Sequence, residues 1–220
     1  MPKRSGSYAP KAPAKRYKKA STYTPSVAKQ VKRIVDGTQE LKAHDTVVIG
    51  TAVGNALGLY FAGAVFNIVQ GTGDDQRVGR KVRVKKIHWK GMAENDAVTS
   101  GIHQFYIIHD SQPNGALPVI GDIFSNSAPG AAFLNLDNSH RFRILKSQVV
   151  VHPDKATTNL SQLPFEMHVE CDIPIFFDGT AGAIGDLTTG NILFVCGQNV
   201  SGTTTEAEIN GQVRVRYLDG

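Results

Sequence analysis

The chain has 220 residues, of which 41% are hydrophobic and 20% charged, so it can form one domain with a sizeable core or at most two small ones. Its two cysteines exclude a disulfide-stapled mini-protein and a four-cysteine zinc site, and its apolar stretches are too short to span a bilayer. The net charge of +5 is divided unevenly: residues 1–35 contain ten of the 24 basic side chains, whereas all 19 acids lie beyond them.

Residues 1–25 are rich in Pro, Ala, Ser and Lys, and we expect them to be disordered because they cannot bury enough apolar surface to offset the ordering entropy. Tyr8, Tyr17 and Tyr23 are interleaved with the charges, a combination that suits unpaired nucleic-acid strands. A solubilising tail is the alternative, and a membrane-binding arm is disfavoured because no bulky apolar face accompanies the charges. The predicted nucleic-acid-binding residues of the arm are Lys3, Arg4, Lys11, Lys15, Arg16, Lys18, Lys19, Lys29, Lys32 and Arg33.

The basic arm contains two further features. A nuclear-import-like cluster is formed by Lys15, Arg16, Lys18 and Lys19. Next, apolar residues recur at i, i+4, i+7 and i+8 from Val27, between a candidate N-cap at Ser26 and Gly37, which predicts a short junction helix, with a linker turn as the alternative. We therefore divide the chain into a basic disordered arm with a junction helix, residues 1–37, and a folded domain, residues 38–220.

Beyond residue 38, short runs of Val, Ile, Phe and Thr alternate with Gly, Asn, Asp and Pro clusters. No helical patterns of 10–15 residues lie between these runs, which excludes a βαβ sheet. A jelly-roll or immunoglobulin-type sandwich and a closed barrel remain, and the long connections favour an all-β, single jelly-roll sandwich of about eight strands. The predicted strands are residues 39–49, 57–69, 80–92, 102–109, 141–151, 165–173, 191–197 and 208–218.

Three predicted strands alternate basic with apolar residues, around residues 80–90, 141–144 and 213–217. In the first, Lys81, Arg83 and Lys85 lie opposite Val82 and Val84, and the apolar parity then shifts, as a β-bulge would cause. Each strand would pack one face on the core and present cations on the other. Those cations either face a ligand or pair with acids of the folded domain.

Motifs for catalysis are missing from the sequence. Residues 71–79 are rich in glycine but lack the lysine pattern and spacing of a phosphate loop. Asp74 and Asp75 could bind a divalent cation, although adjacent carboxylates more often form a plain turn. His109, Asp110 and Ser111 are neighbours in the sequence, and neighbours rarely have the spatial geometry of a catalytic triad. The seven histidines are scattered, and Cys171 and Cys196 form no CxxC pair. We therefore expect no enzyme, no cofactor and no resident metal.

Four stretches together resemble the capsid proteins of small circular, Rep-encoding single-stranded DNA viruses, the circovirus- and geminivirus-like group. They are the basic arm continuing into residues 31–42; residues 68–91; residues 110–115 followed by Pro118 and residues 122–124; and residues 135–150. The resemblance implies a jelly-roll subunit that self-assembles with other copies, sixty in a T=1 icosahedral shell, around single-stranded DNA. It also implies location in the virion and the host nucleus, entry through a nuclear import receptor, and DNA contacts from Arg80, Lys81, Arg83 and Lys85.

Two other functions remain as alternatives to a capsid protein. The first is a non-viral or small-oligomeric nucleic-acid-binding β-sandwich module, which would share the basic arm. The second is a carbohydrate-binding β-sandwich, which is disfavoured because the chain has one Trp and 8% aromatic residues.

Overall fold

The computed structural model of the protein describes residues 26, 27, 29–31, 34, 41–60, 67–95, 100–153, 162–200 and 207–219. A short helix, α2 (Ile120–Ile123), lies in the long connection between the fourth and fifth strands. None of the helices among these residues has the length and apolar character needed to cross a membrane. The strands are β1 (Leu41–Val53), β2 (Gly58–Leu59), β3 (Lys81–Glu94), β4 (Gly101–Asp110), β5 (Phe142–His152), β6 (Gln162–Phe177), β7 (Leu187–Thr189), β8 (Asn191–Val200) and β9 (Ala207–Asp219).

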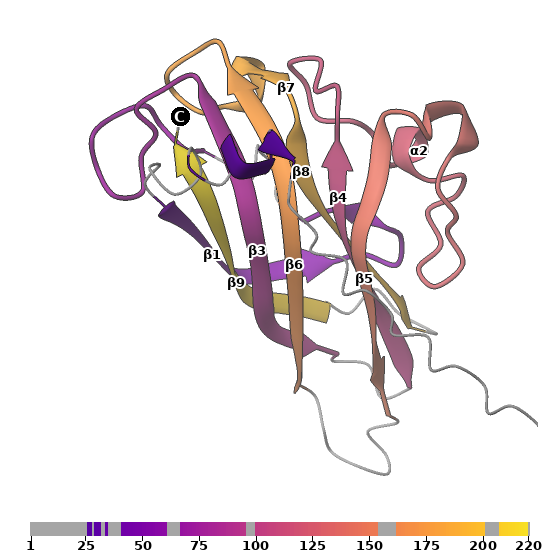
Figure 1. The fold of residues 1–220 in the computed structure, drawn as a ribbon. Coiled ribbons are helices and arrows are strands. Elements are labelled where there is room, and N and C mark those ends of the chain that lie inside the picture. Colours follow the sequence, from indigo (N-terminus) through magenta and orange to yellow (C-terminus); the bar gives the residue numbers. More distant parts are fainter. Residues whose placement is uncertain are drawn as a thin grey trace, which may run out of the picture.

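The strands form two antiparallel sheets that pack face to face (Figure 1). One sheet has five strands in the order β1-β9-β3-β6-β7, and the other has four in the order β2-β8-β4-β5. When the short β7 is left out, the remaining eight strands follow the order 1-8-3-6 in one sheet and 2-7-4-5 in the other. This is the strand order of a jelly roll, and it confirms the predicted all-β, single jelly-roll fold.

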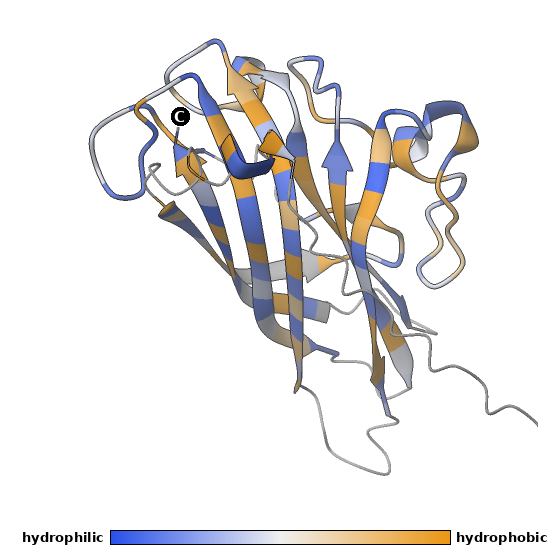
Figure 2. Ribbon diagram, in the orientation of Figure 1, coloured by the Kyte–Doolittle hydropathy of each residue, from blue (hydrophilic) through white to orange (hydrophobic). Residues whose placement is uncertain are grey.

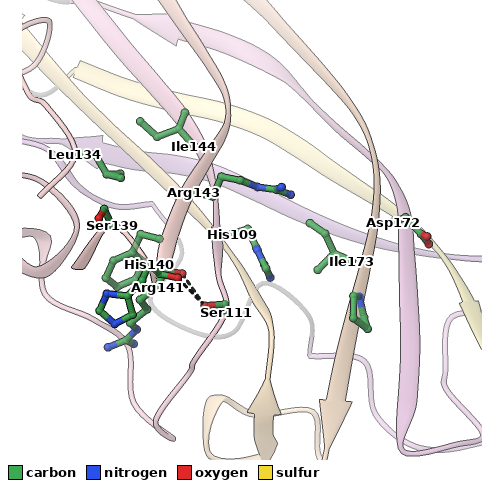
Figure 3. Close-up of a pocket in the computed structure, with 12 residues that line it drawn as sticks. His109, Ser111, Leu134, Ser139, His140, Arg141, Arg143, Ile144, Asp172 and Ile173 are labelled. Atoms are coloured by element: carbon green, nitrogen blue, oxygen red, sulfur yellow. Dashed lines mark hydrogen bonds between the residues drawn. The ribbon is translucent and has the colours of Figure 1, made fainter. Parts of the chain in front are cut away.

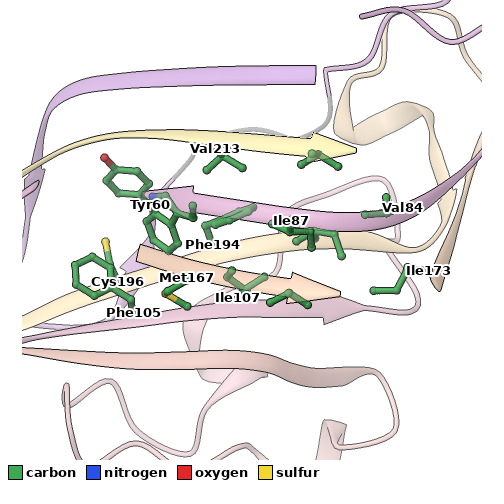
Figure 4. Packing of buried hydrophobic residues seen from close by; sticks show 14 of the residues in the cluster. Tyr60, Val84, Ile87, Phe105, Ile107, Met167, Ile173, Phe194, Cys196 and Val213 are labelled. Carbon is green, nitrogen blue, oxygen red and sulfur yellow. The ribbon is translucent and has the colours of Figure 1, made fainter. Parts of the chain in front are cut away.

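Trp89 lies at the centre of the core between the two sheets. Its ring centroid is 5.0 Å from that of Phe194, 5.3 Å from those of Tyr60 and Phe165, and 5.4 Å from that of Phe105. The three phenylalanine contacts are edge-to-face, the arrangement that aromatic quadrupoles prefer. Figure 4 shows several of these rings among the aliphatic side chains of both sheets.

Hydrophilic and hydrophobic residues alternate along β3 and β6 (Figure 2), so each strand has a core face and an outer face. Val82 and Val84 are fully buried, as predicted. The pairing of β3 with both β6 and β9 shifts register between Val84 and Lys86. Lys85 is the extra residue of a β-bulge relative to β9, whereas β6 has one residue more than β3 over the same step. Beyond the bulge Trp89 is buried, so the parity shift in the sequence is explained.

Three strand predictions differ from the structure. The second predicted strand, residues 57–69, is reduced to Gly58–Leu59 among the described residues, and residues 61–66 of that range lie outside them. The prediction missed β7, whose three residues are too few for a periodicity signal. In β5, Ile144 is exposed and Leu145 packs against the core instead, because the β4–β5 register shifts opposite Ile107 and Ile108.

The described residues of the predicted junction helix, Val27, Lys29–Val31 and Ile34, are helical. The carbonyl oxygen of Ser26 accepts hydrogen bonds from the amides of Lys29 and Gln30, at 2.8 and 3.1 Å, so this helix begins just after Ser26. Residues 1–25 and 35–40 lie outside the described part of the chain. The disorder of the arm and the boundary at residue 37 therefore stay predictions.

Candidate nucleic-acid interface

The outer side of β3, β6 and β9, which we call the charged face, carries the predicted cations of the folded domain. Arg83 and Lys85 point outward from β3 and share one carboxylate of β6, Asp172. The Arg83 Nη2 is 2.7 Å from Asp172 Oδ2, and the Lys85 Nζ is 2.9 Å from Asp172 Oδ1. The structure thus brings these two predicted residues together around an acid that the sequence analysis did not single out.

The other two predicted strand cations are more loosely held. Arg80 makes an exposed ion pair with Asp178 at 3.3 Å. The Lys81 Nζ lies 5.3 Å from the centre of the Phe176 ring, within the range of a cation–π contact. Exposed ion pairs of this kind contribute at most about 1 kcal/mol, so a phosphate can displace Asp178 from Arg80 at little cost.

Further ion pairs extend across the charged face. Lys86 pairs with Glu170 at 3.0 Å, and Arg214 of β9 donates two hydrogen bonds to Asp45 of β1, at 2.7 and 2.6 Å. The bidentate Arg214 guanidinium holds the pKa of Asp45 below its usual range. Much of the charge on this face is therefore neutralised within the subunit.

Two cations of the same sheet differ from these. Lys90 and Arg216 form an ion pair with none of the carboxylates that the structure describes. Both side chains are exposed on the outer side, since the core-facing residues next to them are Trp89 and Val215. They therefore add positive charge that is not compensated by an ion pair, and the sequence analysis did not single them out.

A cleft of about 510 Å³ lies at one side of the sandwich, lined by residues that include Arg143 of β5 and Ile173 of β6 (Figure 3). Arg141 enters it just before β5 and is held by a buried carboxylate, Asp110, through two hydrogen bonds of 2.8 Å. This pair raises the pKa of Arg141, so the guanidinium stays charged.

The Asp110–Arg141 pair also explains the run from His109 to Ser111. The carboxylate of Asp110 is bound to Arg141 and to the backbone amide of Gln112, and it does not orient His109. The Ser111 hydroxyl donates to the carbonyl oxygen of Arg141 at 3.0 Å. The three neighbours thus connect β4 to the start of β5 and form no catalytic triad.

The glycine-rich loop of residues 71–79 holds cations rather than phosphates. The buried Lys42 Nζ donates to the carbonyl oxygen of Gln76 at 3.0 Å and lies 3.4 Å from Asp219 Oδ2. Asp219 also accepts from the amide of Val78 at 2.6 Å. Because the carbonyls of the loop point at a lysine, the loop is a structural closure over the ends of β1 and β9.

Arg77 secures the same loop from inside. Its side chain is fully buried, donates to the carbonyl oxygens of Ile68, Gly79 and Gly179, and lies 4.2 Å from the centre of the Phe177 ring. Asp74 and Asp75 are exposed on this loop, and a cation at these two residues stays untested. The burial of Lys42 and Arg77 could not be predicted from the sequence, because Lys and Arg side chains are almost always exposed to solvent.

Both cysteines are free thiols. Burial raises the pKa of Cys171 to about 11, with a further contribution from the nearby Asp172 carboxylate, and burial raises the pKa of Cys196 to about 12. Neither thiol is therefore a reactive thiolate near neutral pH.

The arm cations lie almost entirely outside the described residues. Lys29 is exposed on the junction helix, whereas the remaining nine are not described. Their role in binding nucleic acid, and the nuclear-import role of the cluster from Lys15 to Lys19, stay predictions.

Comparisons with known proteins place the chain among viral coat proteins. A curated relative, the capsid protein of Miscanthus streak virus (isolate 91), is 26% identical over an alignment of 151 positions that covers 57% of this chain. The chain spans 58% of the length of that relative. The solved native virion of Kashmir bee virus at acidic pH aligns with 99% of this chain and 83% of its own, at 10% identity and a TM-score of 0.29.

The family profile described as satellite tobacco necrosis virus coat protein matches residues 13–219. This range includes about two thirds of the predicted arm and nearly the whole jelly roll, and it confirms the expectation of a viral capsid protein with a structural role. The finer expectation, a capsid of the circovirus- and geminivirus-like group, stays a prediction. The chain belongs to the satellite tobacco necrosis virus coat protein family.

Proposed function

We propose that the chain is the shell subunit of a small icosahedral virus and packages single-stranded DNA through its basic arm. The division of charge carries this proposal: ten Lys or Arg and no acid in residues 1–35 precede a domain in which acids outnumber bases. Such an arm neutralises phosphates and releases their counterions, so that assembly of the shell is coupled to the nucleic acid. The tyrosines of the arm would stack on unpaired bases without reading their sequence.

The folded domain offers a smaller second set of contacts. Arg80, Lys81, Arg83 and Lys85 would add to the arm where a phosphate replaces Asp172 or Asp178. Because the charged face pairs most of its own charge, we expect its share of the binding free energy to be much smaller than that of the arm.

The connection between β4 and β5 carries a surface suited to contact with neighbouring copies, which we call the apolar loop surface: Val119, Phe133 and Leu136. Phe133 is 78% exposed and Leu136 83% exposed. The loop is nevertheless well held, because the backbone amide of Asn135 donates to the Ile123 carbonyl at 2.8 Å. Exposed apolar side chains on a fixed loop are typical of protein–protein contact sites.

We propose a T=1 shell of sixty copies, located in the virion and, during assembly, in the host nucleus, which the cluster Lys15, Arg16, Lys18 and Lys19 would allow the protein to enter through an import receptor. Membership of a coat-protein family disfavours the alternative, a nucleic-acid-binding module that acts as a small oligomer. Electron microscopy of the purified protein distinguishes the two, since only the shell predicts closed particles of uniform size.

The test of the arm is a salt titration of binding to single-stranded DNA. Deleting residues 1–25 removes seven basic side chains, so at roughly 0.7 per phosphate the log–log slope should become shallower by about 5. A full-length variant with the same seven residues changed to Gln should behave like the deletion, which controls for chain length. An unchanged slope in both variants would contradict the proposal.

A second variant separates stacking from charge. Changing Tyr8, Tyr17 and Tyr23 to Ser should weaken binding, because base–aromatic stacking contributes about 1–3 kcal/mol per base. The salt slope should stay the same, since no phosphate contact is lost. Parallel titrations with single-stranded RNA and duplex DNA then test the choice of cargo.

A further inference from the structure

A group of two histidines and one glutamate lies on the charged face, and no part of the proposed packaging function uses it. His88 comes from β3, whereas Glu166 and His168 come from β6. The Glu166 Oε1 is 2.8 Å from His88 Nε2 and 3.1 Å from His168 Nε2. All the ligand atoms of the group lie within 4.8 Å of one another.

Strand register and the bulge at Lys85 create this group. His88 pairs directly with His168 across the two strands, and Glu166 is two residues from His168, hence on the same face of β6. Without the bulge, His88 would share the inward parity of Val82 and Val84. The extra residue turns His88 outward, so its imidazole stacks on that of His168 with ring centroids 3.9 Å apart.

We propose that His88, Glu166 and His168 bind a divalent transition metal of the Zn²⁺ class. Two imidazole nitrogens and one carboxylate oxygen are a common ligand set for zinc, with water in the fourth position. Metal–ligand bonds of about 2.0–2.1 Å place tetrahedral ligands roughly 3.4 Å apart. The observed separations of 2.8 and 3.1 Å therefore need to open by only a few tenths of an ångström.

Protonation of the ligands explains how the same residues exist with and without metal. In the metal-free form each Nε2 can donate a proton to Glu166, and these two hydrogen bonds lower the pKa of the carboxyl, which stays ionised. Metal binding at Nε2 requires each neutral imidazole to carry its proton on Nδ1 instead. Because protons and metal compete for the same nitrogens, affinity should fall as the pH falls.

The kinds of ligand atom set the metal selectivity, within surroundings that are cationic. Lys90 pairs with Glu166, and Arg214 pairs with His88, in the strand register, so the surroundings are cationic. Arg214 is partly neutralised by its bonds to Asp45. With a single carboxylate the site has too few oxygen ligands for Ca²⁺ or Mg²⁺, which prefer six or more, whereas nitrogen ligands favour Zn²⁺, Co²⁺ and Cu²⁺.

The experiment is calorimetric titration of Zn²⁺, and absorption titration of Co²⁺, into the full chain freed of nucleic acid. The wild-type chain should bind one ion, and His88→Ala, His168→Ala and Glu166→Gln should each lower the affinity at least about tenfold. His140→Ala, a change of another exposed histidine, is the matched control and should leave the affinity within about twofold. Since the changed residues are at or near the surface, circular dichroism should show unaltered folding.

The outcomes are decisive in both directions. Supporting results are the loss of binding in the three variants, an affinity that falls at least about tenfold from about pH 7.5 to about pH 5.5, and no competition from Mg²⁺ or Ca²⁺. Equal binding by wild type and His168→Ala, or no binding by wild type, would overturn the site and leave a hydrogen-bonded cluster. Packaging of nucleic acid is measured separately and does not depend on either result.

Discussion

The charged face and the apolar loop surface are both exposed to solvent, but they differ in whether the subunit satisfies its own side chains. On the charged face, Arg83, Lys85 and Asp172 neutralise one another, and Arg214 is bound by Asp45. On the apolar loop surface, Phe133 and Leu136 are among the most exposed large hydrophobic residues described, and no part of the described chain covers them. We therefore expect stability and assembly to depend on different regions of the subunit.

The largest effect is expected from a charge in the core behind the charged face. Val82→Asp or Val84→Asp should prevent folding, because both side chains are fully buried and an unpaired carboxylate there has no partner. Soluble expression and circular dichroism measure the outcome. Val47→Asp, at an exposed position of the same sheet, is the control and should fold. A folded Val82→Asp variant would show that the assigned strand faces are reversed.

Charges on the apolar loop surface should instead abolish assembly while folding is kept. Phe133→Asp combined with Leu136→Asp replaces two exposed apolar side chains that would contact a neighbouring copy. Neither side chain belongs to the core clusters, so folding should not depend on them. We expect the same melting profile for the dissociated subunit and no closed particles by electron microscopy. Val47→Asp should still form shells, and shells formed by the loop variant would refute the assignment of this surface.

The two kinds of ion pair can be compared directly. Asp110→Ala leaves Arg141 partly buried and unpaired, so the free energy of unfolding should fall by about 3–5 kcal/mol. Asp178→Ala breaks the exposed pair with Arg80 and should cost at most about 1 kcal/mol. Urea unfolding of the unassembled subunit measures both. Equal effects would mean that burial does not distinguish these pairs.

Acid should destabilise the four-stranded sheet before it affects the charged face. His103 is fully buried with its ring centroid 4.7 Å from that of His152, and burial, with the charge of His152, lowers the pKa of His103 to about 4. Between about pH 6.5 and about pH 4, His103 is therefore protonated in the unfolded state but neutral in the folded state. The free energy of unfolding keeps its full value above about pH 6.5 and falls by on the order of 3 kcal/mol as the pH decreases to about 4.

Carboxylates of the charged face respond in a different pH range. The pKa values of Asp45 and Glu166 are lowered, by Arg214 and by the two histidines, so their contributions are lost only as the pH falls below their ordinary values near 4. His103→Leu should therefore flatten the stability profile between about pH 6.5 and about pH 4 and leave the steeper loss below it. If the stability profile of His103→Leu matched that of the wild type, groups other than His103 would be responsible for the loss of stability in this pH range.

The smallest effect concerns the contribution of the charged face to nucleic-acid binding. Arg83→Gln with Lys85→Gln should make the salt slope shallower by about 1.4 if both side chains contact phosphates. Asp172→Asn, which removes the carboxylate that both cations share, should strengthen binding. If neither variant changes the slope, Arg83 and Lys85 do not contact phosphates, and the arm alone binds the nucleic acid.

Strand periodicity predicted the fold well, because long strands such as β3 and β6 have one buried and one exposed face. The alternation around Trp89 located the strand, its inward residues and the bulge. The second predicted strand was wrong in length, since apolar residues of a loop, such as the buried Ile68, give the same signal as a strand. In β5 the bulge escaped notice because Ile144 and Leu145 are both apolar and show no change of parity.

The site residues were harder to predict, because pairing across strands is a matter of register. Glu166 and His168 lie about 80 positions from His88 in the sequence, and nothing local connects them. The alternation of Glu166 and His168 on one face of a strand was the available signal. The partners of Arg83 and Lys85 were hidden for the same reason, as was the buried Lys42 beneath the 71–79 loop.

The bulge at Lys85 also bears on how this strand can change in length. Removing Lys85 alone would restore one-to-one pairing with β9, with Val84 and Ile87 still inward and His88 outward, but it would leave two unmatched residues in β6 instead of one. Removing a residue farther along, such as Ile87, would reverse the direction of all side chains from there to the end of the strand. Within β3, deletions during the divergence of related coats should therefore be least disruptive at this position, and otherwise they should be confined to the loops.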